Sequence, residues 1–150
     1  MKLRVVWITP KSRSKDPAYD MLTREYVARI GRYQPIQASD VPSEAALLKL
    51  RESATGRTSP VLVLLDSLGK EMTSEQLAKF LESQQATDVQ QLIFAIGPAD
   101  GFSDETRRFA SRSISLGKMT LPHELARVVL LEQIYRAFTI LRKHPYHCGH

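Results

Sequence analysis

The amino-acid sequence predicts an α/β fold in which a mostly parallel sheet is flanked by helices. Two runs, VLVLL at 61–65 and LIFAI at 92–96, are apolar without alternation, as expected for parallel strands that are covered on both faces. Helical segments separate these and other β-branched runs, which is typical of a layered α/β protein. The chain has 150 residues, 43% of them hydrophobic, so we expect one domain over residues 1–150 with a core of its own.

The amino-terminal part begins with a strand and a capped helix. Residues 3–9 (LRVVWIT) are rich in β-branched and aromatic side chains, which favours a strand. Asp16 and Pro17 provide a side-chain cap and a first-turn proline. A helix is therefore expected to begin there and to end before Gly31.

The next elements lead into the first apolar strand. Residues 35–39 predict a weak second strand, and residues 43–53 (SEAALLKLRES) have the apolar spacing of a helix. Residues 55–60 (TGRTSP) are rich in turn formers and break this pattern. The strand at 61–65 follows, and we expect Asp66 to end it.

A further helix and strand come next. Thr73 and Gln76 have the spacing of a capping box and predict a helix that runs to about Leu81. The apolar strand at 92–96 follows, and residues 97–101 (GPADG) read as a loop.

The last elements are a short helix, a strand and a long helix. Ser103 is expected to cap the short helix, with Asp104 and Glu105 in its first turn, where carboxylates interact favourably with the helix dipole. Residues 112–116 predict a fifth strand. The final helix is expected over about 122–142.

Loops that contain glycine follow three of the strands. Gly69 comes after the strand at 61–65, Gly97 begins the loop at 97–101, and Gly117 follows the fifth strand. Ligands of open α/β sheets bind at the carboxyl ends of the strands, and glycine lets backbone approach a ligand closely. The pattern predicts a pocket there, although plain turns would also use glycine.

The third of these loops, 116–121 (LGKMTL), is largely uncharged where a surface connection would normally be polar. Common pocket motifs are missing from the sequence. No glycine follows the first strand, Gly69 and Lys70 lack the earlier glycine of a phosphate-binding loop, and no Gly-x-Ser-x-Gly or Cys/His nucleophile arrangement occurs in the folded part. The sequence thus argues against a dinucleotide site, a conventional methyltransferase site of the Rossmann type, a nucleoside triphosphate site and a site built on these nucleophile motifs.

The final helix carries a wide apolar arc. Its apolar members are Leu130, Leu131, Ile134, Tyr135, Ala137, Phe138 and Leu141. His123 and Arg127 lie within the same arc. His123 is either a site residue or a helix-start residue with one satisfied nitrogen. The width of the arc also suits a helix that is buried in a homodimer interface.

Arg127 is a cation within this apolar arc and needs a partner. Two carboxylates are candidates, Glu132 of another chain and Asp66. The alternative is that Arg127 lies at an interface or a site. Glu132, Arg136 and Thr139 are expected to share the opposite side of the helix.

Charge and cysteine content limit the partners and the compartment. The chain has 21 Lys and Arg against 16 Asp and Glu, a net charge of +5, which favours a polyanion such as RNA but also occurs in proteins without such a partner. Cys148 is the single cysteine, and one thiol cannot form an internal disulfide, which suits a reducing cytosol. The apolar start is too short for a membrane span and lacks the features of a signal peptide. We therefore expect a cytoplasmic protein.

The sequence contains an ordered series of motifs. They are Leu65-Asp66 with Gly69-Lys70, Ser74-Glu75, Phe94-Ala-Ile-Gly97 with Asp100-Gly101 and Ser103, Ser115-Leu116, Thr120-Leu-Pro-His123, Arg127, Glu132-Gln-Ile-Tyr-Arg-Ala137 and Pro145-Tyr-His147. This series resembles the RlmH family, ribosomal large-subunit pseudouridine N3-methyltransferases of the SPOUT class. The resemblance covers essentially the whole chain and is densest from Val61 onward.

The resemblance implies a SPOUT fold with a carboxyl-terminal trefoil knot, an exception to the usual unknotted topology. The knotted backbone would enclose S-adenosylmethionine in a bent conformation, which explains an apolar loop that uses backbone groups for polar atoms. Lys118 would point to solvent. The implied cofactor-binding residues are Leu65, Gly97, Leu116, Gly117, Lys118, Met119, Thr120 and Leu121.

The implied reaction is methylation of N3 of a pseudouridine, position 1915 in helix 69 of 23S rRNA, in the assembled 70S ribosome. The implied enzyme is a homodimer with its site between two subunits, where the carboxyl-terminal tail approaches the cofactor. Tyr146 and His147 are then candidates for positioning the base or assisting its deprotonation, with Arg136 and His123 in support. Basic residues that could hold rRNA phosphates are Lys11, Arg13, Lys15, Arg142 and Lys143.

Three features depart from the family pattern. Pro98 replaces a usual glycine, which stiffens the loop and removes a backbone donor, and Gly117 replaces a usual serine. The tail ends in HCGH at 147–150 rather than in a basic residue shortly after Tyr-His. Histidine and cysteine in this tail suggest a metal site, but they are crowded at the terminus without the spacing of structural zinc sites, so no metal is expected.

Two further functions remain open from the sequence. One is a SPOUT methyltransferase that acts on another RNA. The other is a noncatalytic RNA-binding or assembly protein, in which Pro98 and the altered tail have abolished cofactor binding while the basic surface remains.

Overall fold

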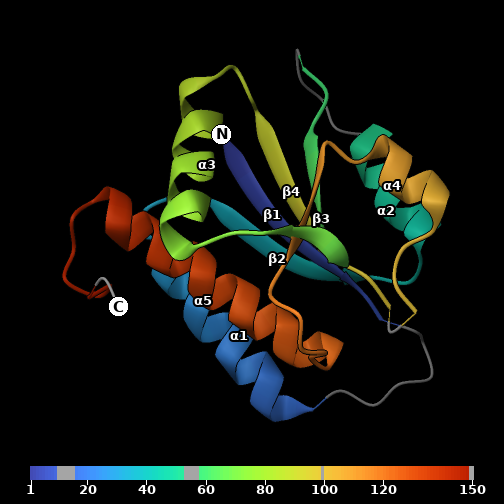
Figure 1. Ribbon diagram of the computed structural model, residues 1–150, viewed down its shortest axis with the longest axis horizontal. Helices are drawn as coiled ribbons and strands as arrows, with labels where there is room; N and C mark the ends of the chain where they lie inside the picture. Colours follow the sequence, from blue (N-terminus) through green and yellow to red (C-terminus); the bar gives the residue numbers. More distant parts are fainter. Residues whose placement is uncertain (10–15, 53–57, 99, 149–150) are drawn as a thin grey trace.

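The structure, a computed structural model, describes residues 1–9, 16–52, 58–98 and 100–148 (Figure 1). Five parallel strands form one sheet in the order β2-β1-β4-β3-β5. The strands are β1 (Lys2–Ile8), β2 (Ile36–Val41), β3 (Val61–Glu71), β4 (Gln91–Ile96) and β5 (Arg112–Ser115). The helices are α1 (Pro17–Ile30), α2 (Glu44–Glu52), α3 (Ser74–Ala86), α4 (Asp104–Phe109) and α5 (His123–Leu141). The predicted fold class is confirmed.

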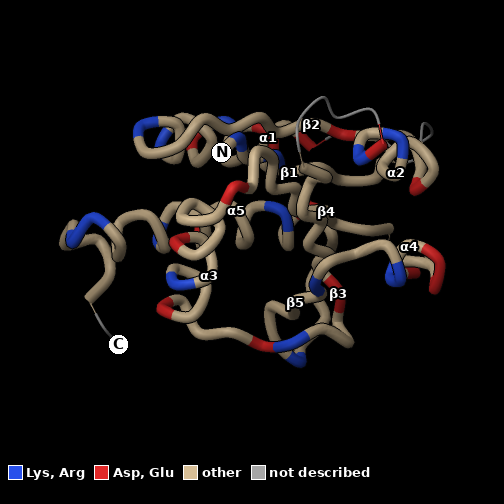
Figure 2. Tube along the Cα trace, turned by 90° about the horizontal axis from the view of Figure 1, so that it is seen from above, with Lys and Arg blue, Asp and Glu red and all other residues tan. Residues whose placement is uncertain are grey.

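Helices cover both faces of the sheet. Helices α1, α3 and α5 lie on one face, and α2 and α4 lie on the other (Figures 1 and 2). The alternating side chains of β4 divide between two cores: Phe94 packs under α3 and α5, whereas Ile93 packs with Leu47 of α2 and Phe102. This explains why β4 is apolar at every position from Leu92 onward.

Local capping fixes where two helices begin. The side chain of Asp16 accepts a hydrogen bond from the Ala18 backbone N–H at 2.9 Å, with Pro17 at the first helical position. At α3 the Thr73 hydroxyl accepts from the Gln76 N–H at 3.1 Å, and the Gln76 side chain accepts from the Thr73 N–H at 2.8 Å. Both predicted caps are confirmed.

Two predicted ends were wrong. Asp66 does not end β3, which continues to Glu71 after a register shift in which Leu65 and Lys70 both pair with Ile114 of β5. Gly69 permits this second pairing, because a Cβ there would lie 2.7 Å from backbone atoms of β5. Helix α3 extends past Leu81 to Ala86, since the intervening residues are acceptable helix formers.

Helix α5 is buried largely by its own subunit. It lies against the sheet between α1 and α3, with Leu130, Leu131 and Ile134 fully buried. Thr139 is also fully buried, so the expected polar side of the helix is not solvent-exposed along its whole length. The Thr139 hydroxyl is satisfied by donating to the Arg136 carbonyl at 2.6 Å.

The partner predicted for Arg127 was wrong. Its Nη2 lies 3.5 Å from Oδ1 of Asp20 on α1, and its guanidinium lies 4.2 Å from the ring centroid of Trp7. Asp66 instead pairs with Arg107, and Glu132 pairs with Arg136. Burial lowers the pKa of Arg127, and the carboxylate of Asp20 opposes that shift.

Some expectations concern residues outside the described ranges. They are the phosphate contacts of Lys11, Arg13 and Lys15, the end of the helix predicted over 43–53, part of the break at 55–60, and His150 of the tail. Within the described part of the chain, no helix combines the length and apolarity needed to cross a membrane.

Candidate active site

A pocket of about 730 Å³ lies at the carboxyl ends of β3, β4 and β5. Its walls come from the segment after Leu65, the loop that begins at Gly97, and the connection from Ser115 to the start of α5. A pocket therefore lies where the sequence predicts one, with Gly97 and Gly117 in its lining, but Gly69 belongs to β3 and does not line it. The size of the pocket is that of a site for a small-molecule ligand or cofactor.

The residues predicted to hold a cofactor all line this pocket. They are Leu65, Gly97, Leu116, Gly117, Lys118, Met119, Thr120 and Leu121. Leu65, Leu116 and Leu121 supply partly buried apolar surface, while Lys118 and Met119 are exposed. The structure brings these eight residues together.

Two glycines shape the pocket loops in different ways. Gly97 is buried against Phe102, and a Cβ on it would lie 2.9 Å from Cε2 of that ring. Gly117 has φ +137°, a conformation that L side chains rarely adopt. The Ser115 hydroxyl closes this turn by accepting from the Gly117 N–H at 3.2 Å and donating to the Gly117 carbonyl at 3.0 Å. The side chain of Ser115 therefore fixes the start of the apolar loop.

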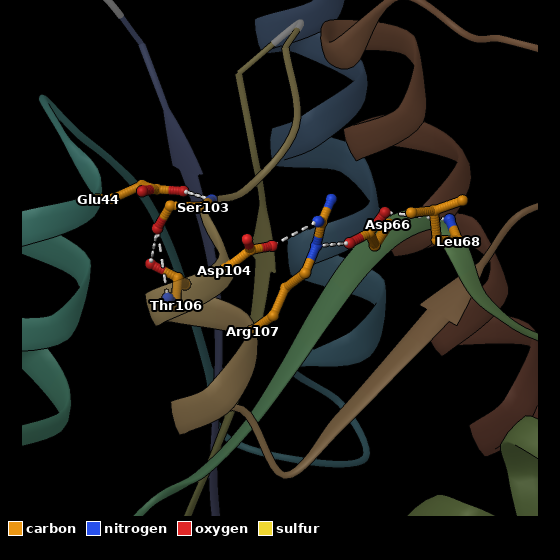
Figure 3. A network of polar contacts seen from close by, with 7 residues as sticks. All are labelled: Glu44, Asp66, Leu68, Ser103, Asp104, Thr106 and Arg107. Atoms are coloured by element: carbon orange, nitrogen blue, oxygen red, sulfur yellow. Dashed lines mark hydrogen bonds and ion pairs between the residues drawn. The ribbon is translucent and has the colours of Figure 1, made fainter.

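An ion pair between a buried carboxylate and a partly exposed arginine lies on one wall of the pocket (Figure 3). Arg107 donates from Nε to Oδ2 of Asp66 at 2.7 Å, and Oδ1 of Asp66 accepts from the Leu68 N–H at 3.0 Å. Arg107 also approaches Asp104 at 3.4 Å. The hydrogen bond to Asp66 raises the pKa of Arg107 above its ordinary value. The pair ties the β3 segment to α4 across the pocket.

The carboxyl-terminal tail forms a second polar cluster on α5. Oε1 of Glu132 accepts from Nε and Nη2 of Arg136 at 3.0 and 2.6 Å, and from the Tyr146 hydroxyl at 3.1 Å. Nη1 of Arg136 lies 3.1 Å from Nδ1 of His147, whose Nε2 lies 2.8 Å from Oε1 of Glu75. The cluster holds the tail against its own subunit.

These contacts define the protonation of the tail. An arginine only donates, so Nδ1 of His147 accepts from Arg136 and Nε2 carries the proton that is donated to Glu75. Burial and the hydrogen bond to Glu132 raise the pKa of Tyr146 to about 12. Tyr146 is therefore a neutral phenol at physiological pH.

Residues 1–147 match the family described as "Predicted SPOUT methyltransferase". The chain belongs to the SPOUT methyltransferase family. A relative from Koribacter versatilis, "Ribosomal RNA large subunit methyltransferase H", is 56% identical over 100% of both chains. A relative of the same name from Geobacter sulfurreducens is 42% identical over 98% of this chain and 99% of its own.

Solved structures share the SPOUT methyltransferase fold at low sequence identity. The SpoU methyltransferase AviRb from Streptomyces viridochromogenes, in complex with AdoMet, superposes with a TM-score of 0.53 and 17% identity over 90% of this chain and 57% of its own. A probable methylase family protein from Haemophilus influenzae gives a TM-score of 0.56 with 10% identity over 96% of this chain and 67% of its own. The trefoil knot of the SPOUT class stays a prediction for this chain.

The predicted catalytic residues of this SPOUT methyltransferase fall in two places. His123 lines the pocket, where α5 begins. Arg136, Tyr146 and His147 form the tail cluster, and about 20 Å of helix separates His123 from Arg136 at about 1.5 Å per residue. The structure of one subunit does not bring the four residues together.

Sequence reasoning did not assign three polar residues of the two sites as site residues. Arg107 was not singled out, although Asp104 and Arg107 have the i, i+3 spacing of neighbours on a helix. Asp66 directly follows the apolar run at 61–65, and a polar residue at that point of the sequence is a signal for a site residue. Glu75 gave no local signal as the partner of His147, because the two are far apart in the sequence.

Within the described residues of this SPOUT methyltransferase, no group of three His, Cys, Asp or Glu side chains is arranged to hold a metal ion. Cys148 is exposed, and His144 accepts from the Tyr146 N–H at 3.3 Å through Nδ1. The tail residues are therefore engaged in local polar contacts.

Proposed function

We propose that the chain is an S-adenosylmethionine-dependent methyltransferase of large-subunit ribosomal RNA, active on N3 of a pseudouridine at position 1915 in helix 69 of 23S rRNA. The observation that carries the proposal is the pocket at the carboxyl ends of β3, β4 and β5 in a SPOUT chain. The names of relatives that match over the whole chain support the choice of rRNA. The proposed catalytic unit is residues 1–150 as one domain, working on ribosomes in the cytoplasm.

The pocket fits the proposed cofactor. It combines apolar walls with the backbone of ordered loops, which suits an adenosine joined to an amino-acid chain. The residues that would hold it are Leu65, Gly97 and those of the 116–121 loop. When bound, S-adenosylmethionine supplies a methyl group that is already activated on a sulfonium sulfur. The protein then has to exclude water and align the acceptor nitrogen.

The tail supplies the groups that would orient the base. Tyr146 retains its proton near neutral pH, so it serves as a hydrogen-bond donor and not as the proton acceptor. Nδ1 of His147 is occupied by Arg136 and Nε2 by its own proton.

We further propose a homodimer in which the tail of one subunit completes the pocket of the other. The separation of about 20 Å between His123 and Arg136 along α5 supports this arrangement, because the tail packs beside Arg136 while the pocket lies at the other end of the helix, beside His123. The alternatives from the sequence, a different RNA substrate or loss of catalysis, are outcomes of the test below.

The test is transfer of a labelled methyl group from S-adenosylmethionine to purified 70S ribosomes that lack the modification. Matched ribosomes carry uridine in place of the pseudouridine. Label that maps to N3 of the pseudouridine, with little transfer to the uridine control, is the expected result. Cofactor binding without transfer would move the substrate to another RNA, and no binding of S-adenosylhomocysteine at millimolar concentration would refute methyltransferase activity.

The shared site has its own test by subunit mixing. A variant with a damaged pocket, Gly97→Trp, and a variant with a damaged tail, Tyr146→Ala, are each expected to be inactive. Mixed dimers contain one site with both an intact pocket and an intact tail, so partial activity should return. Absence of any recovery in mixed dimers verified by mass would contradict a site made by two subunits.

A further inference from the structure

Arg107 lines the pocket and is held from one side by a short buried contact (Figure 3). Its Nε donates to Asp66 at 2.7 Å, and the side chain of Asp66 is 5% exposed. Its Nη1 approaches Asp104 at 3.4 Å, but the side chain of Asp104 is 93% exposed. The first contact fixes the guanidinium, whereas the second is long and solvated and contributes little.

Asp66 is itself fixed by the backbone. One carboxylate oxygen accepts from the Leu68 N–H at 3.0 Å while the other holds Arg107. This arrangement directs Nη2 of Arg107 toward the loop after β4, where it lies 3.6 Å from the Cβ position of Gly101. The edge formed by Nη1 and Nη2 therefore faces the pocket loops.

A guanidinium edge of this kind matches a carboxylate, since two parallel N–H groups can donate to two oxygens. S-adenosylmethionine carries a carboxylate at the end of its amino-acid chain, far from the adenine. Among the described residues, Lys118 is the other Lys or Arg that lines the pocket, but it is exposed and forms no ion pair with those residues. Arg107 is preorganised and Lys118 is not.

We infer that Arg107 binds the carboxylate of the cofactor's methionine moiety through Nη1 and Nη2, with Asp66 as the positioning residue. The inference rests on the proposed function. The ligand carboxylate takes the place of Asp104 at Nη1. Because Asp66 holds Nε, the guanidinium keeps its orientation when this exchange occurs.

The test compares two ligands that differ at the amino-acid end. S-adenosylhomocysteine has the carboxylate, and 5′-methylthioadenosine lacks the whole amino-acid group. Their dissociation constants are measured by calorimetry with the full-length protein. Arg107→Gln is expected to raise the dissociation constant of S-adenosylhomocysteine by about ten- to a hundredfold, the range for loss of a hydrogen bond to a charged group. The dissociation constant of 5′-methylthioadenosine should rise by less than about twofold.

Three variants serve as controls. Arg108→Gln removes the same charge from an exposed neighbour on α4 outside the pocket and is expected to bind both ligands as the wild type does. Asp66→Asn with Arg107→Gln replaces the ion pair by an amide pair, so that no buried carboxylate is left unpaired, and should repeat the ligand-selective loss. Asp104→Asn is expected to bind S-adenosylhomocysteine at least as tightly as the wild type.

Several results would overturn the inference. Equal losses for both ligands in Arg107→Gln would mean that Arg107 only shapes the pocket. A selective loss in Lys118→Gln with none in Arg107→Gln would assign the carboxylate to Lys118. Equal affinity of the wild type for both ligands would exclude recognition of the carboxylate. If the wild type bound neither ligand, the proposed function itself would fail, which distinguishes the two.

Discussion

Gly69 is the position at which a single methyl group should disturb the sheet and the pocket together. A Cβ built there lies 2.7 Å from Ile114 N, Ile114 C and Ser113 C, whereas ordinary contacts begin at 3.4 Å. All three atoms are backbone of β5, so no side chain can rotate away. Relief requires that the second pairing of β3 with β5, at Lys70 and Glu71, moves apart.

We therefore expect Gly69→Ala to lower the free energy of unfolding by about 3 kcal/mol, the upper part of the range for overpacking a well-packed site. For a chain of this length that corresponds to a fall of roughly 6–12 °C in Tm. Binding of S-adenosylhomocysteine should weaken as well, because Asp66 and Ser67 of the same segment line the pocket.

The assay is urea denaturation together with calorimetric titration of the ligand. Gly31→Ala is the matched control, since Gly31 ends α1 with φ −57° and a Cβ there would lie 3.3 and 3.4 Å from two carbonyl oxygens. It should cost less than about 1 kcal/mol. A Gly69→Ala protein whose unfolding free energy stays within about 0.5 kcal/mol of the wild type would refute the reasoning.

Three further outcomes are expected. The raised pKa of Tyr146 predicts that its phenol ionises near pH 12, measured by absorbance after subtraction of the Tyr146→Phe signal. The contribution of this phenol to stability is then complete below about pH 10 and is lost as the pH rises through about 12. Ionisation near pH 10 would contradict this prediction. Glu132→Gln removes the carboxylate that accepts hydrogen bonds from Arg136 and Tyr146, and it should lower the free energy of unfolding, measured in urea, by about 2 kcal/mol. An unchanged midpoint of urea denaturation would show that the tail cluster does not stabilise the fold. Arg127→Met should keep or raise the free energy of unfolding, because it removes a buried cation. Asp20→Asn should lower the same free energy by about 1 kcal/mol, because it leaves that cation without its carboxylate. A larger loss of stability in Arg127→Met than in Asp20→Asn would mean that the pair is net stabilising.

Apolar pattern and capping chemistry are local, and they predicted the elements well. The runs at 61–65 and 92–96 are buried parallel strands, and Thr73 caps α3 through the expected capping box. The extension of β3 past Asp66 was missed because it depends on backbone contact between Gly69 and β5, which lies far along the chain.

The pocket was predictable because parallel strands bring their carboxyl ends to one edge of the sheet. The partners in the ion pairs could not be predicted from the sequence, since they depend on which helices pack together. Arg127 pairs with Asp20 because α1 packs beside α5, and Asp66 forms an ion pair with Arg107 of α4. The resemblance to the RlmH family named the loop residues that line the pocket, but it carried no information about how the tail folds on a single subunit.

The strand order has a consequence for the synthesis of the chain. β4 lies in the middle of the sheet between β1 and β3, yet it is made after both. Until Gln91–Ile96 has left the ribosome, β1 and β3 each lack a neighbour, and their unpaired edges are open to other chains. The nascent protein thus cannot mature gradually from its amino terminus, and it depends on reaching β4 quickly or on protection by chaperones until then.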